Sequence, residues 1–436
     1  MKFNRPFLAR LLGSLLLAAS SLWAEEYNLY QFDESMTIED VEQLEKGNGG
    51  ENAEETLAKP YVIMVSLDGF RHDYVELHGA KNLQEMKESG SFVSRLIPSF
   101  PSKTFPNHYT IATGMYPAHH GLVGNSFYSR TRKAEYRLGN RDAVEDGDWY
   151  GGTPLWVLAE KQGMRSASFF WVGSEADVQG IHPSSHFQYQ KTLPYPLRIE
   201  KVKRWLEEPA STRPHLIMLY FSLTDTAGHV YGPEAPETGK AVRHVDELIG
   251  QLRDYVRASE LPVNLIVTAD HGMSLVDGYV NVRDFVDLKG ARFVSGPMAM
   301  IYTDSESETD RIFAELQGQE KFECYREGTL PSYLNFSNSD RIGDIVLVAQ
   351  APDQLGYFDV EMAWSSGTKA THGFDPYRND EMGAIFIAEG PSIQSGLELS
   401  PVENIHIYPL VASILGLEVP DNIDGRSEVL APLLKK

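Results

Sequence analysis

Carboxylate and imidazole side chains recur in this sequence at or just after short apolar runs that suit buried strands. The candidate metal ligands, which include the histidine of the step Thr371-His372-Gly373, are Asp68, Asp225, His229, Asp270, His271 and His372. Six such side chains suffice for two zinc-like ions with three protein ligands each, and they leave positions open for a substrate. A lone aspartate after a strand is more often a turn former, but the agreement of three strand ends favours a two-metal site.

A hydroxyl group that could act as a nucleophile stands at the predicted start of a helix. Thr104 precedes Phe105-Pro106, and this proline suits the first turn of a helix that would run to about Ala112. A helix N-terminus favours phosphate and alkoxide, because its free N–H groups and its dipole face the anion. Thr104 alone would be interpreted as a helix cap. Beside a bound metal ion, its hydroxyl would have a pKa low enough for nucleophilic attack near neutral pH.

The elements that must position these residues follow from the apolar pattern. Residues 61–67, 216–223 and 263–269 suit strands of a parallel sheet that is buried on both faces. Helices are predicted between them, one over residues 155–162 and another over 240–259. The alternation predicts an α/β sandwich with a mostly parallel central sheet flanked by helices, and ligands bind such sheets at the carboxyl ends of the strands.

The composition divides the chain into three parts, and the last of them contains a possible subdomain. Residues 1–24 carry positive charges ahead of an apolar run too short to span a bilayer, and they predict a signal peptide. Residues 25–59 hold eleven acidic residues against two lysines, and they predict an acidic, flexible extension with a short helix near residues 37–46. Residues 60–436 form the predicted main domain, in which the less regular stretch 287–350 indicates a small subdomain with antiparallel strands.

Charge and cysteine content narrow the class of protein. The 436 residues include 61 Asp and Glu against 39 Lys and Arg, a formal net charge of −22. This balance argues against a protein that binds duplex nucleic acid or an anionic membrane, since such proteins neutralise phosphates with Lys and Arg. Cys324 is the single cysteine, so an internal disulfide is excluded. Together with the signal peptide, these features predict an exported protein, periplasmic in a bacterium or secreted, without a membrane span.

The chain resembles the bacterial members of the nucleotide pyrophosphatase/phosphodiesterase family, within the alkaline phosphatase superfamily, in five motifs that occur in the same order: SLDGFR, KTFPNHYT, TDTAGHVYGP, TADHGM and THGFDP. The resemblance covers about residues 61–420 and implies an alkaline-phosphatase-like α/β core with two zinc ions. It implies the following ligand sets: Asp225, His229 and His372 for one zinc, and Asp68, Asp270 and His271 for the other, with Thr104 bridging toward the second.

The same resemblance implies a mechanism and a substrate class. Thr104 would attack the phosphodiester phosphorus and form a threonyl–nucleotide intermediate, which water would hydrolyse to release a nucleoside 5′-monophosphate. Asn125 would hold a non-bridging phosphate oxygen. Phe105, Tyr189 and Tyr220 would stack on the base of a small-molecule nucleotide, and because aromatic faces accept any base, little discrimination among bases is expected.

Two other functions compete with this interpretation. A phosphodiesterase for choline or lysophospholipid diesters would keep the mechanism and change the substrate, but Phe105 and the acidic surface argue against it. An exported zinc-binding protein without catalysis would need no hydroxyl beside the ligands, and Thr104 argues against it. The sequence sets neither the oligomeric state nor the metal, since the same ligands bind other transition metals.

Overall fold

A buried mixed sheet forms the centre of the computed structural model, which describes residues 29, 31–47, 49–357 and 368–435. Its nine strands, in order across the sheet, are β1 (Lys46–Gly47), β8 (Ser185–His186), β7 (Ser166–Phe169), β9 (Leu216–Phe221), β2 (Tyr61–Leu67), β10 (Val263–Thr268), β19 (Phe386–Glu389), β3 (Ser91–Val93) and β20 (Leu397–Leu399). All residues of β2 and β10 are buried, as expected for apolar strands covered on both faces.

The sheet is parallel at its centre and mixed toward its edges. Strands β8, β7, β9, β2 and β10 run parallel to one another, β1 and β19 pair antiparallel with β8 and β10, and the edge strand β20 pairs parallel with β3. The three predicted strands are confirmed, with β9 ending at Phe221 and β10 at Thr268. Ser66 of β2 pairs with both Tyr220 and Thr268, so the carboxyl ends of these three strands lie level.

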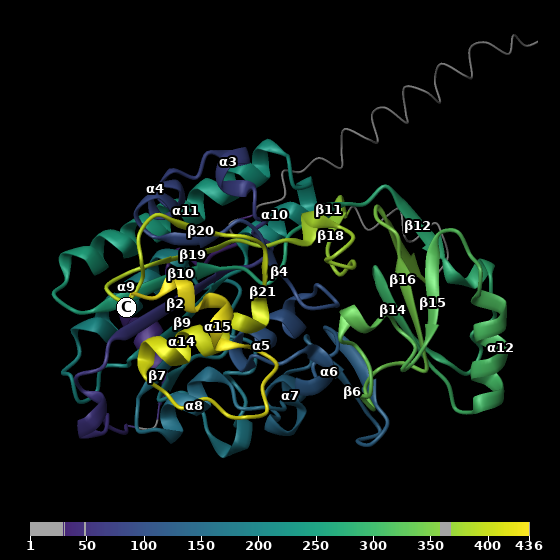
Figure 1. The fold of residues 1–436 in the computed structure, drawn as a ribbon, viewed down its shortest axis with the longest axis horizontal. Coiled ribbons are helices and arrows are strands. Elements are labelled where there is room, and N and C mark those ends of the chain that lie inside the picture. The colour runs from purple at the N-terminus through teal and green to yellow at the C-terminus, as the bar shows by residue number, and fades with distance from the viewer. Residues whose placement is uncertain (1–28, 30, 48, 358–367, 436) are drawn as a thin grey trace, which may run out of the picture.

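Helices cover both faces of the sheet, as Figure 1 shows. The helices on one face are α3 (Tyr74–His78), α4 (Lys81–Ser89), α9 (Tyr195–Glu207), α10 (Leu223–Tyr231) and α11 (Pro236–Ala258). Those on or near the other face are α5 (Thr104–Thr113), α6 (Pro117–His120), α7 (Arg141–Val144), α8 (Leu155–Lys161), α14 (Ile407–Leu415) and α15 (Ser427–Leu430). The predicted helices over 155–162 and 240–259 correspond to α8 and α11, and α11 begins earlier because Pro236 fits its first turn.

The described part of residues 25–59 packs against the main body, whereas the sequence predicted a flexible extension. The predicted signal peptide, residues 1–24, lies outside the described residues. The short helix is present as α2 (Ile38–Leu44), and Val41 on it is fully buried. Strand β1 adds to the edge of the sheet beside β8. The acidic residues face basic partners on α9, where Glu45 lies 2.7 Å from Lys201. Charge complementarity with α9 therefore docks a segment whose composition alone indicates disorder.

Residues 278–356, here called the small lobe, form a separate layer beside the main body (Figure 1). Its antiparallel sheet has the order β13 (Arg292–Val294), β14 (Met298–Tyr302), β16 (Ile345–Ala349), β15 (Phe322–Arg326), and it packs on α12 (Glu306–Leu316). A parallel pair, β12 (Gly278–Asn281) and β17 (Asp353–Gly356), borders it. The small lobe has its own apolar core around Ile301, Ile345 and Leu347. The antiparallel strands expected in residues 287–350 lie within it.

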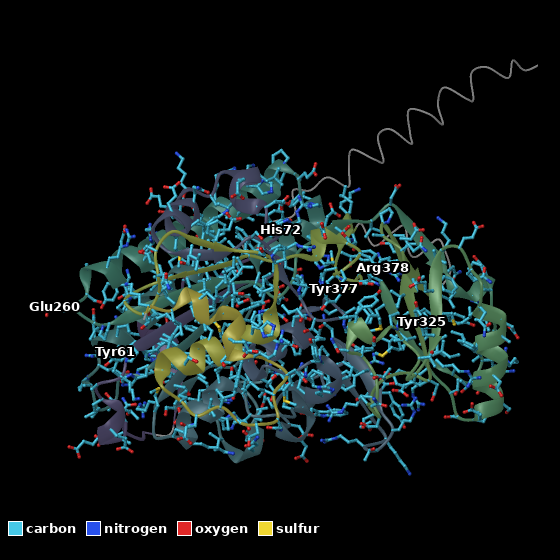
Figure 2. The ribbon with its side chains drawn as sticks, viewed as in Figure 1. Tyr61, His72, Glu260, Tyr325, Tyr377 and Arg378 are labelled. Atoms are coloured by element: carbon cyan, nitrogen blue, oxygen red, sulfur yellow. The ribbon has the colours of Figure 1, made fainter. Side chains whose placement is uncertain are left out.

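The main body also contains three short strand pairs, and polar contacts join it to the small lobe. The pairs are β5 (Ser126–Ser129) with β6 (Ala134–Arg137), β4 (Leu96–Ile97) with β21 (Val402–Glu403), and β11 (Ser274–Leu275) with β18 (Ala370–Thr371). Arg378 of the main body donates to Glu323 of β15 at 2.8 Å, and Figure 2 shows Arg378 and Tyr377 at this junction. Among the described helices, none combines the length and the apolar character needed to cross a bilayer.

Candidate metal centre and nucleophile

The level strand ends bring the three predicted aspartates to one point at the carboxyl edge of the sheet. Asp68 directly follows β2, Asp270 follows β10, and Asp225 lies in the first turn of α10 after β9. Gly69 allows this approach, since it has φ +66° and a Cβ there would lie 2.9 Å from the Cα of Asp225. The edge of the sheet that usually binds ligands in α/β folds therefore carries three carboxylates.

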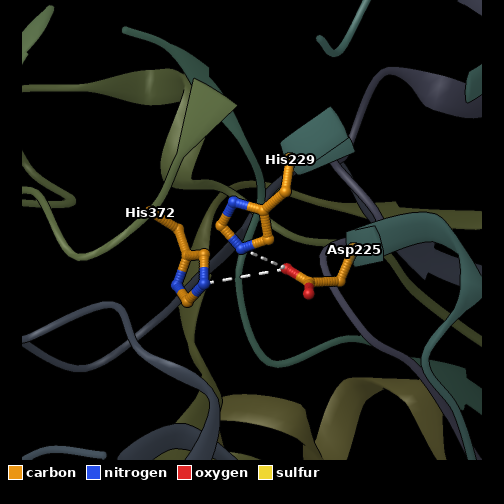
Figure 3. A group of neighbouring side chains, drawn as sticks. All are labelled: Asp225, His229 and His372. Carbon is orange, nitrogen blue, oxygen red and sulfur yellow. Dashed lines mark ion pairs between the residues drawn. The ribbon is translucent and has the colours of Figure 1, made fainter. Parts of the chain in front are cut away.

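Asp225, His229 and His372, here called the outer group, form one candidate metal site (Figure 3). Asp225 and His229 lie one turn apart on α10, and His229 Nε2 is 3.3 Å from Asp225 Oδ1. His372 follows β18, and its Nε2 is 3.7 Å from the same oxygen. Two ligand atoms on a tetrahedral zinc ion lie about 3.4 Å apart, so these distances fit a single ion. The side chains are partly open to solvent, with His229 30% exposed.

Asp68, Asp270 and His271, here called the inner group, lie deeper. His271 Nε2 is 2.9 Å from Asp270 Oδ2 and 3.6 Å from Asp68 Oδ1, and these side chains are at most 3% exposed. The rings of His271 and His372 stack with centroids 3.5 Å apart, which places the two groups side by side. Asp225 also offers an oxygen within 4.8 Å of ligand atoms of Asp68 and His271, so it lies between the two groups.

The three histidines are oriented for binding through Nε2. Each Nδ1 lies close to a backbone carbonyl: that of His229 is 2.7 Å from Ala370 O, that of His271 is 2.9 Å from Gly272 O, and that of His372 is 2.9 Å from Ser102 O. A donated Nδ1–H leaves Nε2 without a proton and with its lone pair directed at the carboxylates. Metal-binding histidines are typically oriented in this way.

The electrostatics of the centre favour a divalent cation. Three buried carboxylate oxygens accept no hydrogen bond of good geometry from the described residues and have only nearby imidazole nitrogens beside them: Asp68 Oδ1, Asp225 Oδ1 and Asp270 Oδ2. Burial raises the pKa of Asp68 well above its usual range, and the negative charges of Asp270 and Asp225 raise it further. Burial also lowers the pKa of His372 well below its ordinary value. Cations bound among these atoms would provide the missing partners, so the residues fit two metal ions.

The outer pair already behaves as an ion pair. Burial by itself would raise the pKa of Asp225, but the neighbouring His229 outweighs it and lowers that pKa to about 2. Burial would likewise lower the pKa of His229, but the carboxylate of Asp225 outweighs it and raises that pKa to about 9.

Thr104 is the first residue of α5, and its side chain does not cap that helix. The cap position belongs to Lys103, and Thr104 Oγ1 lies 3.3 Å from His271 Nε2. The simple interpretation of Thr104 as a helix cap is therefore wrong. Its hydroxyl faces the inner group from a helix N-terminus, where an alkoxide or phosphate is stabilised by the helix dipole.

Asn125 lies next to this helix start. Its Oδ1 accepts a hydrogen bond from the backbone N–H of Phe105 at 2.9 Å. That bond directs the carbonyl end of the amide toward α5 and leaves the NH₂ end able to donate to another oxygen. A phosphate at Thr104 would lie beside such a donor.

The three aromatic residues predicted to contact the base have different surroundings. Tyr189 is 38% exposed, and its ring meets that of Tyr220 edge-on at 6.2 Å. Tyr220 donates its hydroxyl to Asp68 Oδ2 at 2.5 Å, so it also supports the inner group. Phe105 is half-buried and contacts the ring of Tyr136 at 6.1 Å. The structure thus brings Tyr189 and Tyr220 together and leaves Phe105 on the hairpin side of α5.

Two residues near the centre were not predicted to contribute to it. The Nδ1 of His108 on α5 lies 3.3 Å from Asp270 Oδ2, and its Nε2 lies 2.8 Å from Ser66 Oγ. Lys103 is surrounded by protein, and burial lowers its pKa to about 8. The four-residue spacing between Thr104 and His108 places both on one face of a helix, and this signal was available in the sequence.

A mixed α/β sheet with helices on both faces and ligands at its carboxyl edge places the chain among the alkaline-phosphatase-like α/β proteins. The family described as type I phosphodiesterase/nucleotide pyrophosphatase matches residues 62–375, and the chain belongs to this family.

Relatives and solved structures agree with this assignment. The chain is 33% identical to human ectonucleotide pyrophosphatase/phosphodiesterase family member 1 and to venom phosphodiesterase 2 of Crotalus adamanteus, in each case over 86% of this chain. It spans less than half the length of these relatives, 42% and 47% respectively. The structure of murine ectonucleotide pyrophosphatase/phosphodiesterase 5 superposes with a TM-score of 0.81 at 25% identity, and the match covers 86% of this chain and 100% of the murine chain. An inactive threonine-to-alanine form of that murine protein was solved in complex with AMP.

Proposed function

We propose that this chain is a hydrolase with two zinc ions that cleaves nucleotide phosphodiester or phosphoanhydride bonds and releases nucleoside 5′-monophosphates. The observation that carries the proposal is the position of the Thr104 hydroxyl. This hydroxyl caps no helix, and its Oγ1 lies 3.3 Å from His271 Nε2, in a centre where three buried carboxylate oxygens accept no hydrogen bond of good geometry. The outer and inner groups would each hold one zinc. Family membership and the names of the relatives support the reaction class.

In the first step, the Thr104 hydroxyl gives up its proton to solvent water, Thr104 Oγ bonds to the phosphorus of the substrate, and the bond from phosphorus to the leaving oxygen breaks. The positive end of the α5 dipole faces the transferred phosphoryl group, and the amide of Asn125 donates to one of its non-bridging oxygens. When bound, the two divalent cations would lower the pKa of the Thr104 hydroxyl and neutralise charge on the leaving oxygen.

In the second step, water attacks the phosphorus and the bond to Thr104 Oγ breaks. A proton returns to the Thr104 oxygen, and the nucleoside 5′-monophosphate leaves. The burial of the inner group keeps the carboxylates Asp68 and Asp270 away from bulk water, which strengthens their interactions with any bound cation. Tyr220 would hold Asp68 in position through its hydroxyl.

The nucleoside would lie against Tyr189, Tyr220 and Phe105, which stack on any base, so we expect broad base selectivity. Residues 60–436 would form the catalytic domain, with residues 287–350 as its subdomain. We further propose that the protein is periplasmic or secreted after removal of residues 1–24, in keeping with relatives named as ecto-enzymes and venom enzymes.

The test is a comparison of p-nitrophenyl thymidine 5′-monophosphate, p-nitrophenyl phosphorylcholine and p-nitrophenyl phosphate with the zinc-loaded protein. Thr104→Ala should reduce turnover of the nucleotide ester by more than about a thousandfold, an increase of about 4 kcal/mol in the activation free energy. Thr104→Ser is the matched control, because it keeps the hydroxyl. Full turnover by Thr104→Ala would exclude the mechanism. A preference for the choline ester would keep the mechanism and replace the nucleotide with a choline or lysophospholipid diester.

A further inference from the structure

His108 on α5 is fully buried, and each of its two ring nitrogens has its own neighbours. Its Nδ1 lies 2.9 Å from the backbone carbonyl oxygen of Thr104 and 3.3 Å from Asp270 Oδ2. Its Nε2 lies 2.8 Å from the hydroxyl oxygen of Ser66 on β2. A single imidazole ring therefore contacts the residue that carries the proposed nucleophile, a proposed ligand of the inner group and the central strand of the sheet.

The neighbours of the ring determine which nitrogen carries the hydrogen. The groups at Nδ1 are a backbone carbonyl and an ionised carboxylate, which can only accept, so Nδ1 carries the hydrogen and donates to Thr104 O. The hydroxyl of Ser66 can donate, and within the described part of the chain its Oγ has no partner other than His108 Nε2. Ser66 therefore selects the tautomer whose Nδ1–H faces Thr104 and Asp270.

Two aromatic side chains hold the imidazole in this orientation. The rings of Trp171 and Tyr220 meet the ring of His108 edge-on, each with a centroid separation of 5.2 Å. The indole Nε1 of Trp171 also donates to the backbone carbonyl of His108 at 2.9 Å. Because His108 and Trp171 are both buried, close packing opposes rotation of the ring and entry of water.

The two acceptors at Nδ1 belong to groups whose positions matter for the proposed reaction. Asp270 Oδ1 accepts from the backbone N–H of Gly69 at 3.2 Å, whereas Oδ2 lies between His108 Nδ1 and His271 Nε2. The contact with His108 thus limits the rotation of this carboxylate. The carbonyl of Thr104 belongs to the residue whose hydroxyl lies 3.3 Å from His271 Nε2. A shift of the His108 ring would therefore displace the carboxylate and the hydroxyl relative to each other.

We propose that His108 is a positioning residue, which holds Thr104 and Asp270 at the separation that attack on phosphorus requires. Ser66 acts through His108 by fixing its tautomer. The inference rests on the proposed function. In this role His108 contacts neither the substrate nor a cation and transfers no proton. Loss of a residue that orients a metal ligand typically lowers metal affinity or activity by about 10- to 100-fold.

The variants His108→Leu and His108→Asn test the hydrogen bond that Nδ1 donates. Leucine has no donor, whereas the asparagine amide can place an N–H near the position of Nδ1. His108→Leu should weaken zinc binding at the inner position by about tenfold or more, measured by competition with a fluorescent chelator. At saturating zinc, its kcat for p-nitrophenyl thymidine 5′-monophosphate should fall by about tenfold or more, while KM changes less than about twofold. His108→Asn should recover most of both losses.

Ser66→Ala tests whether Ser66 acts through His108. Alone, it should weaken zinc binding at the inner position by about threefold, the effect of losing a neutral hydrogen bond. In the His108→Leu background it should have no further effect, because residues that act in series are not additive. Equal effects of Ser66→Ala in both backgrounds would contradict this part of the inference.

His120→Leu is the matched control. His120 is also a buried histidine that contacts α5, since its Nε2 lies 3.0 Å from Thr110 Oγ1, and among the described residues it contacts none of the candidate ligands. Its substitution should lower the temperature of unfolding, while zinc affinity and kcat stay within about twofold of the wild type.

Unchanged zinc affinity and kcat in His108→Leu would overturn this inference, as would equal losses in His108→Asn or in His120→Leu. If His108→Leu does not fold, Ser66→Ala decides the question, and unchanged zinc affinity in that variant overturns the inference. The proposed function would still stand if turnover depended on Thr104. If the wild type bound zinc but did not hydrolyse the nucleotide ester, the proposed function would fail, and zinc affinity would still test the contact of His108 with Asp270.

Discussion

The outer and inner groups of candidate ligands are built in different ways. Asp225 and His229 of the outer group share one helix, so their spacing follows from the helical repeat, and His229 is open to solvent. The inner group depends on strand pairing between distant segments, since residue 62 pairs with residue 264, and it is almost fully buried. The comparison teaches that two ligands of the outer candidate site are placed by one helix and only His372 by the tertiary fold, whereas in the inner site the pairing of β2 with β10 brings Asp68 to Asp270 and His271.

The supporting contacts differ in the same sense. Side chains hold the inner carboxylates: Tyr220 donates to Asp68, and His108 lies against Asp270. Among the described residues, the outer carboxylate Asp225 has no such side-chain support beyond its own ligand partners, and the histidines of both groups are held by backbone carbonyls. We therefore expect the inner ion to bind more tightly and to exchange more slowly, and substitutions should affect the two positions unequally.

The largest effect is expected from Asp270→Asn, which removes a buried anionic ligand next to the nucleophile. Turnover of the nucleotide ester should fall by about a thousandfold or more, which corresponds to about 4 kcal/mol. The variant should still fold without metal, because one of three crowded carboxylates has lost its charge. Zinc content by elemental analysis and thermal unfolding in chelator measure the two effects. Unchanged turnover with two ions bound would contradict the distinction between the groups.

A smaller effect is expected from His229→Gln in the outer group. Turnover should fall by about a hundredfold, about 2.7 kcal/mol, because one cation position is lost while the inner ion remains. Zinc content should drop from two ions to one, and the remaining ion should resist a chelator that removes the outer one. His119→Gln, at a surface histidine paired with Asp424, is the control. Loss of both ions would show instead that the two positions bind metal as a single unit.

A still smaller effect should follow from Tyr220→Phe, which keeps the ring and removes the hydroxyl that donates to Asp68. Zinc affinity of the inner position should fall by about 10- to 100-fold, as is typical for residues that orient a ligand. The KM for the nucleotide ester should change little, because the ring is retained. Competition with a fluorescent chelator measures the affinity. A raised KM with unchanged zinc affinity would assign Tyr220 to base binding alone.

The smallest effect is expected on the free energy of unfolding rather than on the metal centre. Measured without metal, it reports how acid destabilises the fold itself. Burial lowers the pKa of His120 to about 3, so this histidine is neutral in the fold but is protonated in the unfolded chain below about pH 6.5. Its contribution to stability is thus complete above pH 6.5 and is lost as the pH falls toward 3. Between pH 6.5 and 5.5 the loss is about 1 kcal/mol.

Chemical unfolding in the presence of chelator at these two pH values measures this loss, and His120→Gln should be less acid-sensitive by the same amount. An identical pH dependence in the variant would place the acid sensitivity elsewhere in the fold.

The sequence predicted the central strands well because their signal is local. Residues 61–67, 216–221 and 263–268 are mostly apolar, and the residues after them carry the candidate ligands. The docking of residues 31–59 was not predictable, since it depends on basic partners on α9 such as Lys201. The contact of Tyr128 with Arg292 was not predictable either, because the two residues meet only through packing of the β5–β6 hairpin on the small lobe.

The strand order also has a consequence for how the chain folds. The central strand β2 is made early, but its neighbours β9 and β10 begin at residues 216 and 263, and β10 pairs on its other side with β19 at residues 386–389. Such long sequence separations make folding slow, since distant segments must meet before the sheet gains stability. A chain interrupted before residue 372 lacks one member of the outer group, and one interrupted before residue 386 leaves β10 with an open edge. Stable binding of two metal ions would therefore indicate that the chain has been synthesised and folded to its end.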